Sequence, residues 1–186
     1  MIALLIIAGF LAGSVPFGVI VAKQRGVDIR AQGSGNIGAT NVARVLGLAD
    51  GLLVLLLDAG KGGLITLVAM RVDGDPWVIA ATGFASVLGH CFSPFLGWKG
   101  GKGVATALGV FVVTAPALAL VAVSVFLVVA GRTRVPALGS LGGVTSATVY
   151  AFVTSQPAPI ELLALATSLL LVYTHRGNLA SFYQAS

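Results

Sequence analysis

"VATALGVFVVTAPALALVAVSVFLVVAG", residues 104–131, is a run of 28 residues without one charged side chain. As a single helix it would be about 42 Å long, whereas the hydrocarbon core of a bilayer is about 30 Å thick. Pro116 lies near its middle, and proline interrupts helices and favours a helix start. The run is therefore either one long tilted helix or two short passes that meet near Pro116, and this choice decides the topology.

The whole chain has the composition of an integral membrane protein. Of its 186 residues, 57% are hydrophobic and 9% are charged, and the mean hydropathy is +1.01, whereas a soluble domain carries about 25% charged residues. Eleven basic residues stand beside six acidic ones, which favours an anionic ligand or an anionic membrane surface. We expect one all-α domain over residues 1–186, a polytopic helical bundle. The single cysteine, Cys91, excludes an internal disulfide.

Five further apolar segments are candidate membrane spans, because about 20 apolar residues in a helix cross a bilayer core. The first lacks a basic leading region and a small-residue cleavage site, so we interpret it as a retained helix and not as a signal peptide. The five segments are 2–22, 51–70, 77–97, 136–155 and 158–174.

The distribution of charge favours two crossings by residues 104–131. With two crossings, the loops 23–49, 98–103 and 132–135 share one side with the residues from 175 onward. The positive-inside rule places this side in the cytoplasm. We therefore expect seven transmembrane helices, with the N-terminus outside and the C-terminus in the cytoplasm. Each of the two central passes reaches only about 20 Å, which requires local thinning of the bilayer or partial burial. The predicted cytoplasmic side holds nine of the eleven basic residues: Lys23, Arg25, Arg30, Arg44, Lys99, Lys102, Arg132, Arg134 and Arg176.

The polar stretch "GSGNIGATNVAR", residues 33–44, is unusual in so apolar a chain. Its glycines permit sharp turns, and a short helix is predicted from Ala39 to Leu46, ended by Gly47. Asn41 and Arg44 then lie one turn apart on one face. Backbone donors, a helix N-terminus and a guanidinium together favour phosphate binding. The alternative is a tight interfacial turn. A dinucleotide site is disfavoured because no βαβ unit surrounds the glycines.

Two other polar segments belong to the same predicted side. In "GWKGGKGVAT", residues 97–106, Lys99 and Lys102 flank glycines ahead of a helix start. This arrangement suits a phosphate, although ordinary positive-inside lysines are the alternative. In "THRGN", residues 174–178, His175 and Asn178 are spaced to face one way if the helix continues. Ser140 begins the sixth span, where a serine is often an N-cap.

Three further candidates lie inside predicted spans. Asp58 and Lys61 are separated by one helical turn, and intramembrane charges are costly enough to suggest function, although a structural ion pair is equally compatible. His90, at the end of the third span, is either a pocket residue or a helix-terminal hydrogen-bonding group. No metal-ligand spacing and no nucleophile elbow occur, and we expect neither a metal nor a cofactor. A cluster of phosphate-binding groups without a protein nucleophile favours direct attack of one substrate on another.

Five segments together resemble the bacterial acyl-phosphate:glycerol-3-phosphate acyltransferase family, in order along nearly the whole chain. They are "GSVPFG" (13–18), "GSGNIGATNVAR" (33–44), "LDAGKGG" (57–63), "GHCFSPFLGWKGGKGVAT" (89–106) and "HRGN" (175–178).

The resemblance implies a seven-helix enzyme of the bacterial inner membrane with its active site on the cytoplasmic side. Such an enzyme transfers an acyl group from acyl phosphate to the 1-hydroxyl of glycerol 3-phosphate, giving lysophosphatidic acid and phosphate, the first step of phospholipid synthesis. A substrate phosphate would accept the hydroxyl proton. The partners implied are these two substrates and the lipid bilayer, without nucleic acid. The family's terminal arginine is replaced here by Ser181. The resemblance assigns phosphate and substrate binding to Ser34, Gly35, Asn36, Thr40, Asn41, Arg44, Lys99, Gly100, Gly101 and Gly103, and catalysis to Lys102, Ser140, His175 and Asn178.

Two other functions fit parts of the sequence. A small transporter of phosphate esters would use Asp58 and Lys61 to line a path, but alternating access normally uses repeated halves and no repeat is found. A lipid-binding scaffold would use the basic face only to attract anionic headgroups.

Overall fold

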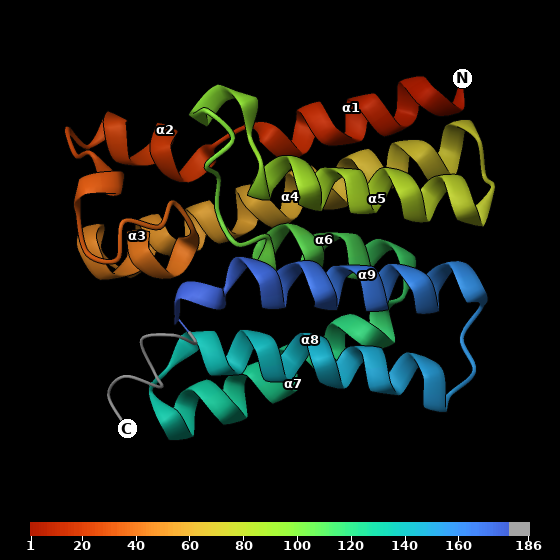
Figure 1. Ribbon diagram of the computed structural model, residues 1–186. Helices are drawn as coiled ribbons and strands as arrows, with labels where there is room; N and C mark the ends of the chain where they lie inside the picture. The colour runs from red at the N-terminus through yellow and green to blue at the C-terminus, as the bar shows by residue number, and fades with distance from the viewer. Residues whose placement is uncertain (179–186) are drawn as a thin grey trace.

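The computed structural model describes residues 1–178, and this part of the chain is an all-helical bundle without a β-strand (Figure 1). Two short 3-10 turns, η1 (Ile29–Ala31) and η2 (Pro94–Leu96), lie in the connections. The α-helices are α1 (Ile2–Ser14), α2 (Phe17–Gln24), α3 (Ala39–Leu46), α4 (Leu48–Val72), α5 (Pro76–Cys91), α6 (Val104–Thr114), α7 (Pro116–Thr133), α8 (Pro136–Val153) and α9 (Ala158–Thr174).

The uncharged run 104–131 forms two helices, as one of the two interpretations predicted, and the single long helix is wrong. Helix α6 ends at Thr114, and α7 begins at Pro116. Ala115 between them leaves the helical region, with φ −155° and ψ 79°. Pro116 has no N–H to continue the α6 ladder, but its fixed φ suits the first turn of α7. Figure 1 shows α6 and α7 running in opposite directions, so the chain reverses at this point.

Two predicted spans are interrupted. Residues 2–22 were expected to form one helix, but α1 ends at Ser14 and α2 starts after Pro16. Pro16 lacks the donor that an unbroken helix requires, and Val15 is extended with ψ 119°. The span 77–97 likewise ends as a helix at Cys91, and η2 follows. Sequence patterning missed these breaks because apolar residues continue through both.

By length and composition, four segments of residues 1–178 are able to cross a membrane: Ile2–Gln24, Leu48–Val72, Pro76–Leu96 and Pro116–Thr133. Val104–Thr114 and Ala158–Thr174 are shorter apolar helices. Large apolar side chains such as Leu4, Leu56 and Leu120 are exposed on the outside of the bundle, where hydrocarbon is the solvent that suits them.

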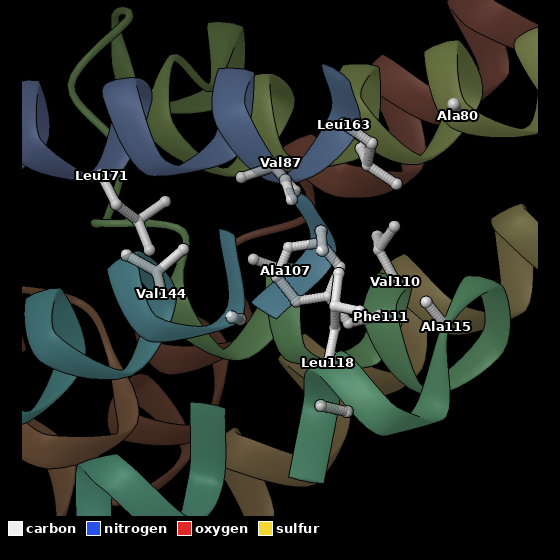
Figure 2. Packing of buried hydrophobic residues seen from close by; sticks show 14 of the residues in the cluster. Ala80, Val87, Ala107, Val110, Phe111, Ala115, Leu118, Val144, Leu163 and Leu171 are labelled. Carbon is white, nitrogen blue, oxygen red and sulfur yellow. The ribbon is translucent and has the colours of Figure 1, made fainter. Parts of the chain in front are cut away.

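The largest apolar core lies between α5, α6, α7, α8 and α9. Phe111 and Leu118 are almost fully buried and lie near Val87 and Leu163 (Figure 2). Small residues bring helix backbones together, as is common in membrane bundles. A Cβ on Gly13 of α1 would overlap the backbone of Ser86 in α5, and one on Gly109 of α6 would overlap that of Ala59 in α4.

Four connecting or terminal segments meet at one end of the bundle. Figure 1 places the α2–α3 region, the connection between α5 and α6, the α7–α8 turn and the end of α9 at this end. A separate buried cluster that includes Ile29, Ile37, Val42 and Val54 fixes the α2–α3 region onto α4. The polar segments singled out in the sequence are therefore held side by side.

Candidate active site

A cavity of about 650 Å³ opens at the end of the bundle where these segments meet. Its mouth is polar, and its deeper walls come from the apolar faces of α4, α6 and α7, with residues such as Leu55, Phe111 and Phe126. A charged group can thus bind at the mouth while an attached hydrocarbon chain lies between the helices. The polar lining residues include Ser34, Asn36, Thr40, Asn41, Arg44, Lys102, Arg134, Ser140, His175 and Asn178.

The loop before α3 has the predicted form. Helix α3 spans Ala39–Leu46 and ends at Gly47, whose φ is 102°, which confirms the predicted bounds. Gly33 and Gly35 are left-handed, with φ of 59° and 69°, so the chain turns where the sequence indicated. The amide oxygen of Asn36 accepts a hydrogen bond from the Gly38 N–H at 2.8 Å. The loop brings Ser34 and Asn36 to the cavity mouth.

Asn41 organises this loop from within. It is 2% exposed, and its Oδ1 accepts from the Ser34 N–H at 2.8 Å. Its Nδ2 donates to the carbonyls of Gln32 at 3.0 Å and Asn36 at 2.9 Å. The amide is thus largely occupied by the loop it holds. Asn41 lines the cavity, and its geometry is that of a residue that shapes the site.

Arg44 and Lys102 give the cavity mouth its positive charge. Arg44 lies one turn after Asn41 and donates from Nη1 to Asn41 Oδ1 at 3.3 Å, as the spacing indicated. Lys102 Nζ donates to Asn178 Oδ1. Burial, with repulsion from the nearby Arg44, lowers the pKa of Lys102 below its usual value. Two cations held close together favour a ligand that neutralises both, such as a phosphate dianion.

The glycines of the α5–α6 connection have a packing role. The N–H groups of Gly100 and Gly101 donate to the carbonyls of Cys91 and His90, each at 3.0 Å. These donors are therefore used inside the protein. Gly103, the N-cap of α6, is left-handed with φ 84° and lines the cavity. Gly35, Lys99, Gly100 and Gly101 do not line the cavity, and the side of the loop that carries Lys99 is exposed.

The end of α9 supplies a histidine to the mouth. His175 is 2% exposed, and its Nδ1–H donates to the Leu171 carbonyl at 2.7 Å, which leaves Nε2 as the acceptor of a neutral ring. Burial lowers the pKa of His175, opposed by the bond to Leu171 and assisted by the charge of Lys102, so the neutral form is favoured. Thr174 Oγ1 donates to the Lys102 carbonyl at 3.1 Å and joins α9 to the lysine loop.

Ser140 and Arg134 line the cavity from the region where α7 ends and α8 begins. Ser140 is not an N-cap, because α8 begins earlier, after Val135; its Oγ donates to the Pro136 carbonyl at 3.0 Å. Arg134, at the end of α7, has a left-handed φ of 59° and also lines the cavity. Sequence reasoning counted Arg134 only as a topological charge. The feature of the sequence that could have identified Arg134 as a cavity residue is its position just before the helix that carries Ser140. Ser181 lies outside the described residues.

Asp58, Lys61 and His90 form a buried polar cluster beneath the mouth. Lys61 Nζ lies 2.7 Å from Asp58 Oδ1 and 3.0 Å from His90 Nδ1, and all three residues are buried. Asp58 and His90 also line the cavity, whereas Lys61 does not. The pair therefore faces the bundle interior, as a structural ion pair does. Within residues 1–178, no three histidine, cysteine, aspartate or glutamate side chains lie close enough to hold a metal ion.

The protein is an all-helical membrane bundle, and its cavity has a cationic mouth and apolar walls. These features are those of the membrane enzymes that act on phosphorylated lipid precursors. Comparison with known proteins identifies the family. The model of the glycerol-3-phosphate acyltransferase family matches residues 3–185. The chain belongs to this family.

Curated relatives and solved structures agree. A glycerol-3-phosphate acyltransferase of Aquifex aeolicus is 45% identical over 94% of this chain and 92% of its own length. One from Anaeromyxobacter sp. (strain K) is 50% identical over 95% of this chain and 91% of its own. The crystal structure of PlsY (YgiH), an integral membrane glycerol 3-phosphate acyltransferase, in its glycerol 3-phosphate form superposes with a TM-score of 0.94 at 43% identity, covering 99% of this chain and 92% of that one. Its lysophosphatidic acid form gives 0.93 at 42% identity.

Proposed function

We propose that this chain transfers an acyl group from acyl phosphate to the 1-hydroxyl of glycerol 3-phosphate, giving lysophosphatidic acid and phosphate. The observation that carries the proposal is the single cavity that joins a cationic mouth to apolar walls. Both substrates are phosphorylated, and one carries a hydrocarbon chain. The two crystal structures of PlsY are described as a glycerol 3-phosphate form and a lysophosphatidic acid form. They support glycerol 3-phosphate as the acceptor and lysophosphatidic acid as the product.

The reaction needs positioning more than a protein nucleophile. The hydroxyl oxygen attacks the acyl carbon, the bond from that carbon to the phosphate oxygen breaks, and the proton passes to a substrate phosphate. Arg44 and Lys102 would neutralise the phosphates and hold the two substrates so that the hydroxyl lies next to the acyl carbon. His175 Nε2 is the acceptor of the neutral ring, because Nδ1–H donates to Leu171, and it would accept a hydrogen bond from glycerol. Ser34, Asn36, Ser140 and Asn178 supply further polar contacts at the mouth.

The same geometry supports a topology. We infer seven crossings, with the cavity mouth and the C-terminus in the cytoplasm of a bacterium and the N-terminus outside its inner membrane. The support is that Arg44, Lys102 and Arg134 line the cavity. The segments at the same end of the bundle carry most other basic residues of the chain. Single-cysteine labelling near Pro116 and Arg132 tests this, because the two positions lie at opposite ends of α7.

The test of function is turnover by the purified protein in phospholipid–detergent micelles. Acyl phosphate plus glycerol 3-phosphate should give lysophosphatidic acid and equimolar phosphate. Lys102→Ala and Arg44→Ala should each lose most activity, whereas Lys23→Ala, which removes an exposed cation outside the cavity, should not. Robust turnover with acyl-CoA as sole donor contradicts the donor assignment. Uptake of glycerol 3-phosphate by proteoliposomes without any acyl donor would support a transporter instead.

A further inference from the structure

The buried cluster of Asp58, Lys61 and His90 lies where three parts of the chain meet, and no step of the proposed reaction uses it. Asp58 and Lys61 are one turn apart in α4, and His90 lies in the last turn of α5. Lys61 Nζ is 2.7 Å from Asp58 Oδ1, and His90 Nδ1 is 3.6 Å from the same oxygen. Charges this deep in a membrane protein are costly, so their partners define what they do.

One side of the cluster holds the break between α1 and α2. Lys61 Nζ donates to the Val15 carbonyl at 2.7 Å. The break leaves this carbonyl without an α-helical partner four residues on, and it also accepts from the Phe17 N–H at 3.2 Å. The ammonium also lies 5.6 Å from the centroid of the Phe17 ring. Nearby, Ser93 Oγ donates to the Ser14 carbonyl at 2.7 Å. The lysine is therefore anchored on the break between α1 and α2, and from there its Nζ lies 3.0 Å from His90 Nδ1.

The other side of the cluster supports the loop that carries Lys102. The Gly101 N–H donates to the His90 carbonyl at 3.0 Å, and a Cβ on Gly101 would overlap the His90 imidazole. The residue after Gly101 is Lys102, whose carbonyl is fixed in turn by Thr174 at 3.1 Å. The imidazole is thus packed directly beneath the peptide that leads into Lys102. The position of the ring therefore limits where the backbone that leads into Lys102 lies.

We propose that His90, oriented by Lys61 and Asp58, is a positioning residue that sets the place of Lys102 at the cavity mouth. The inference rests on the proposed function only for what Lys102 does. The contacts that place Lys102 concern the connection between α5 and α6 alone. His90 acts through Gly101 and Lys102 and not by contact with the phosphates. The Asp58–Lys61 pair is neutral as a unit, so it orients the ring without changing the positive charge of the mouth.

The kinetic test is a double-mutant cycle. His90→Ala should lower kcat/KM for glycerol 3-phosphate by about tenfold or more, within the range that slight misplacement of a catalytic group produces. In a Lys102→Ala background the same change should cost little, because the residue it positions is gone. His90→Asn, whose amide oxygen is able to accept from Lys61, should recover part of the loss. Ser86→Ala, a buried change one turn earlier in α5, is the matched control.

Equal losses from His90→Ala in the two backgrounds would overturn the proposal, because they would show a structural effect that does not pass through Lys102. A second measurement does not depend on turnover. A spin label at Lys102→Cys should become more mobile with His90→Ala than with Ser86→Ala, and buried Cys91 is shielded from the label. Unchanged mobility would also refute the proposal. Failure of the wild-type protein to turn over, with the mobility change observed, would instead remove the proposed function and leave the positioning role.

Discussion

Replacing Asn41 tests whether the phosphate-binding loop is held in place from beneath. In Asn41→Ala the Ser34 N–H and the carbonyls of Gln32 and Asn36 lose hydrogen bonds of 2.8, 3.0 and 2.9 Å. At about 1 kcal/mol for each, the loop loses about 3 kcal/mol of preference for its binding conformation. If substrate must then order the loop, its apparent affinity falls on the order of a hundredfold.

The assay is steady-state kinetics with glycerol 3-phosphate varied, together with hydrogen–deuterium exchange over residues 29–38. We expect KM to rise by about this factor, with faster exchange confined to the loop. Asn41→Asp should be worse than Asn41→Ala, because it keeps the acceptor for Ser34 but turns a carboxylate oxygen toward two carbonyls. Gln32→Ala is the control, since Asn41 hydrogen-bonds to the main-chain carbonyl of Gln32, which this change keeps.

An Asn41→Ala protein with unchanged KM and unchanged exchange would refute this reasoning. An Asn41→Asp protein that matches the wild type would also refute it, because the hydrogen bonds that Asn41 Nδ2 donates would then not contribute to the loop conformation. A large fall in thermal stability without a change in KM would place Asn41 in the global fold and not in the site.

Three other perturbations have definite expected outcomes. Burial and Arg44 lower the pKa of Lys102 from its usual 10.5, so its charge is lost at a lower pH than that of an ordinary lysine. KM for glycerol 3-phosphate should therefore begin to rise below pH 10.5. Lys102→Arg, whose guanidinium stays charged, should remove this alkaline rise from the pH–KM profile. An identical rise in the variant would count against the assignment. Ala122→Phe places an aromatic ring in the apolar part of the cavity. Across a chain-length series, turnover of long-chain acyl phosphates should therefore fall several-fold more than turnover of short-chain ones. Equal losses would exclude this wall as the acyl site. Arg25→Gln breaks the ion pair with Asp50 at 3.0 Å, but the arginine side chain is 61% exposed, so the free energy of unfolding should change by less than about 1 kcal/mol in thermal or denaturant unfolding.

The helices could largely be predicted from the sequence because hydropathy and proline positions act locally. The break before Pro116 and the bounds of the 39–46 helix followed from residues within a few positions of each site. The break at Val15 did not, since apolar residues continue on both sides of Pro16 and a hydropathy pattern does not register a lost hydrogen bond. The Val15 carbonyl at this break accepts from Lys61, 46 residues away, as well as from the nearby Phe17 N–H.

The site could be predicted in part for a related reason. The sequence indicated that residues 33–44, Lys102, Ser140 and His175 share one end of the bundle, and the structure places Lys102, Ser140, His175 and most of residues 33–44 around one cavity. The sequence could not distinguish groups that remain available to a ligand from groups used internally. The donors of Gly100 and Gly101 are used by the last residues of α5, which depends on how the loop folds back. The apolar walls, and Arg134 among the lining residues, likewise depend on packing between helices far apart in sequence.

The short length of α6 has a consequence for how the protein is made. Its 11 residues rise about 16 Å, roughly half of a hydrocarbon core. We therefore expect a nascent chain that ends after Thr114 to hold this segment only weakly in lipid. Integration of α6 should follow synthesis of α7, so that the two helices enter the membrane as a hairpin and α6 then packs on α4. The cavity would then be completed only after the second half of the chain has been translated.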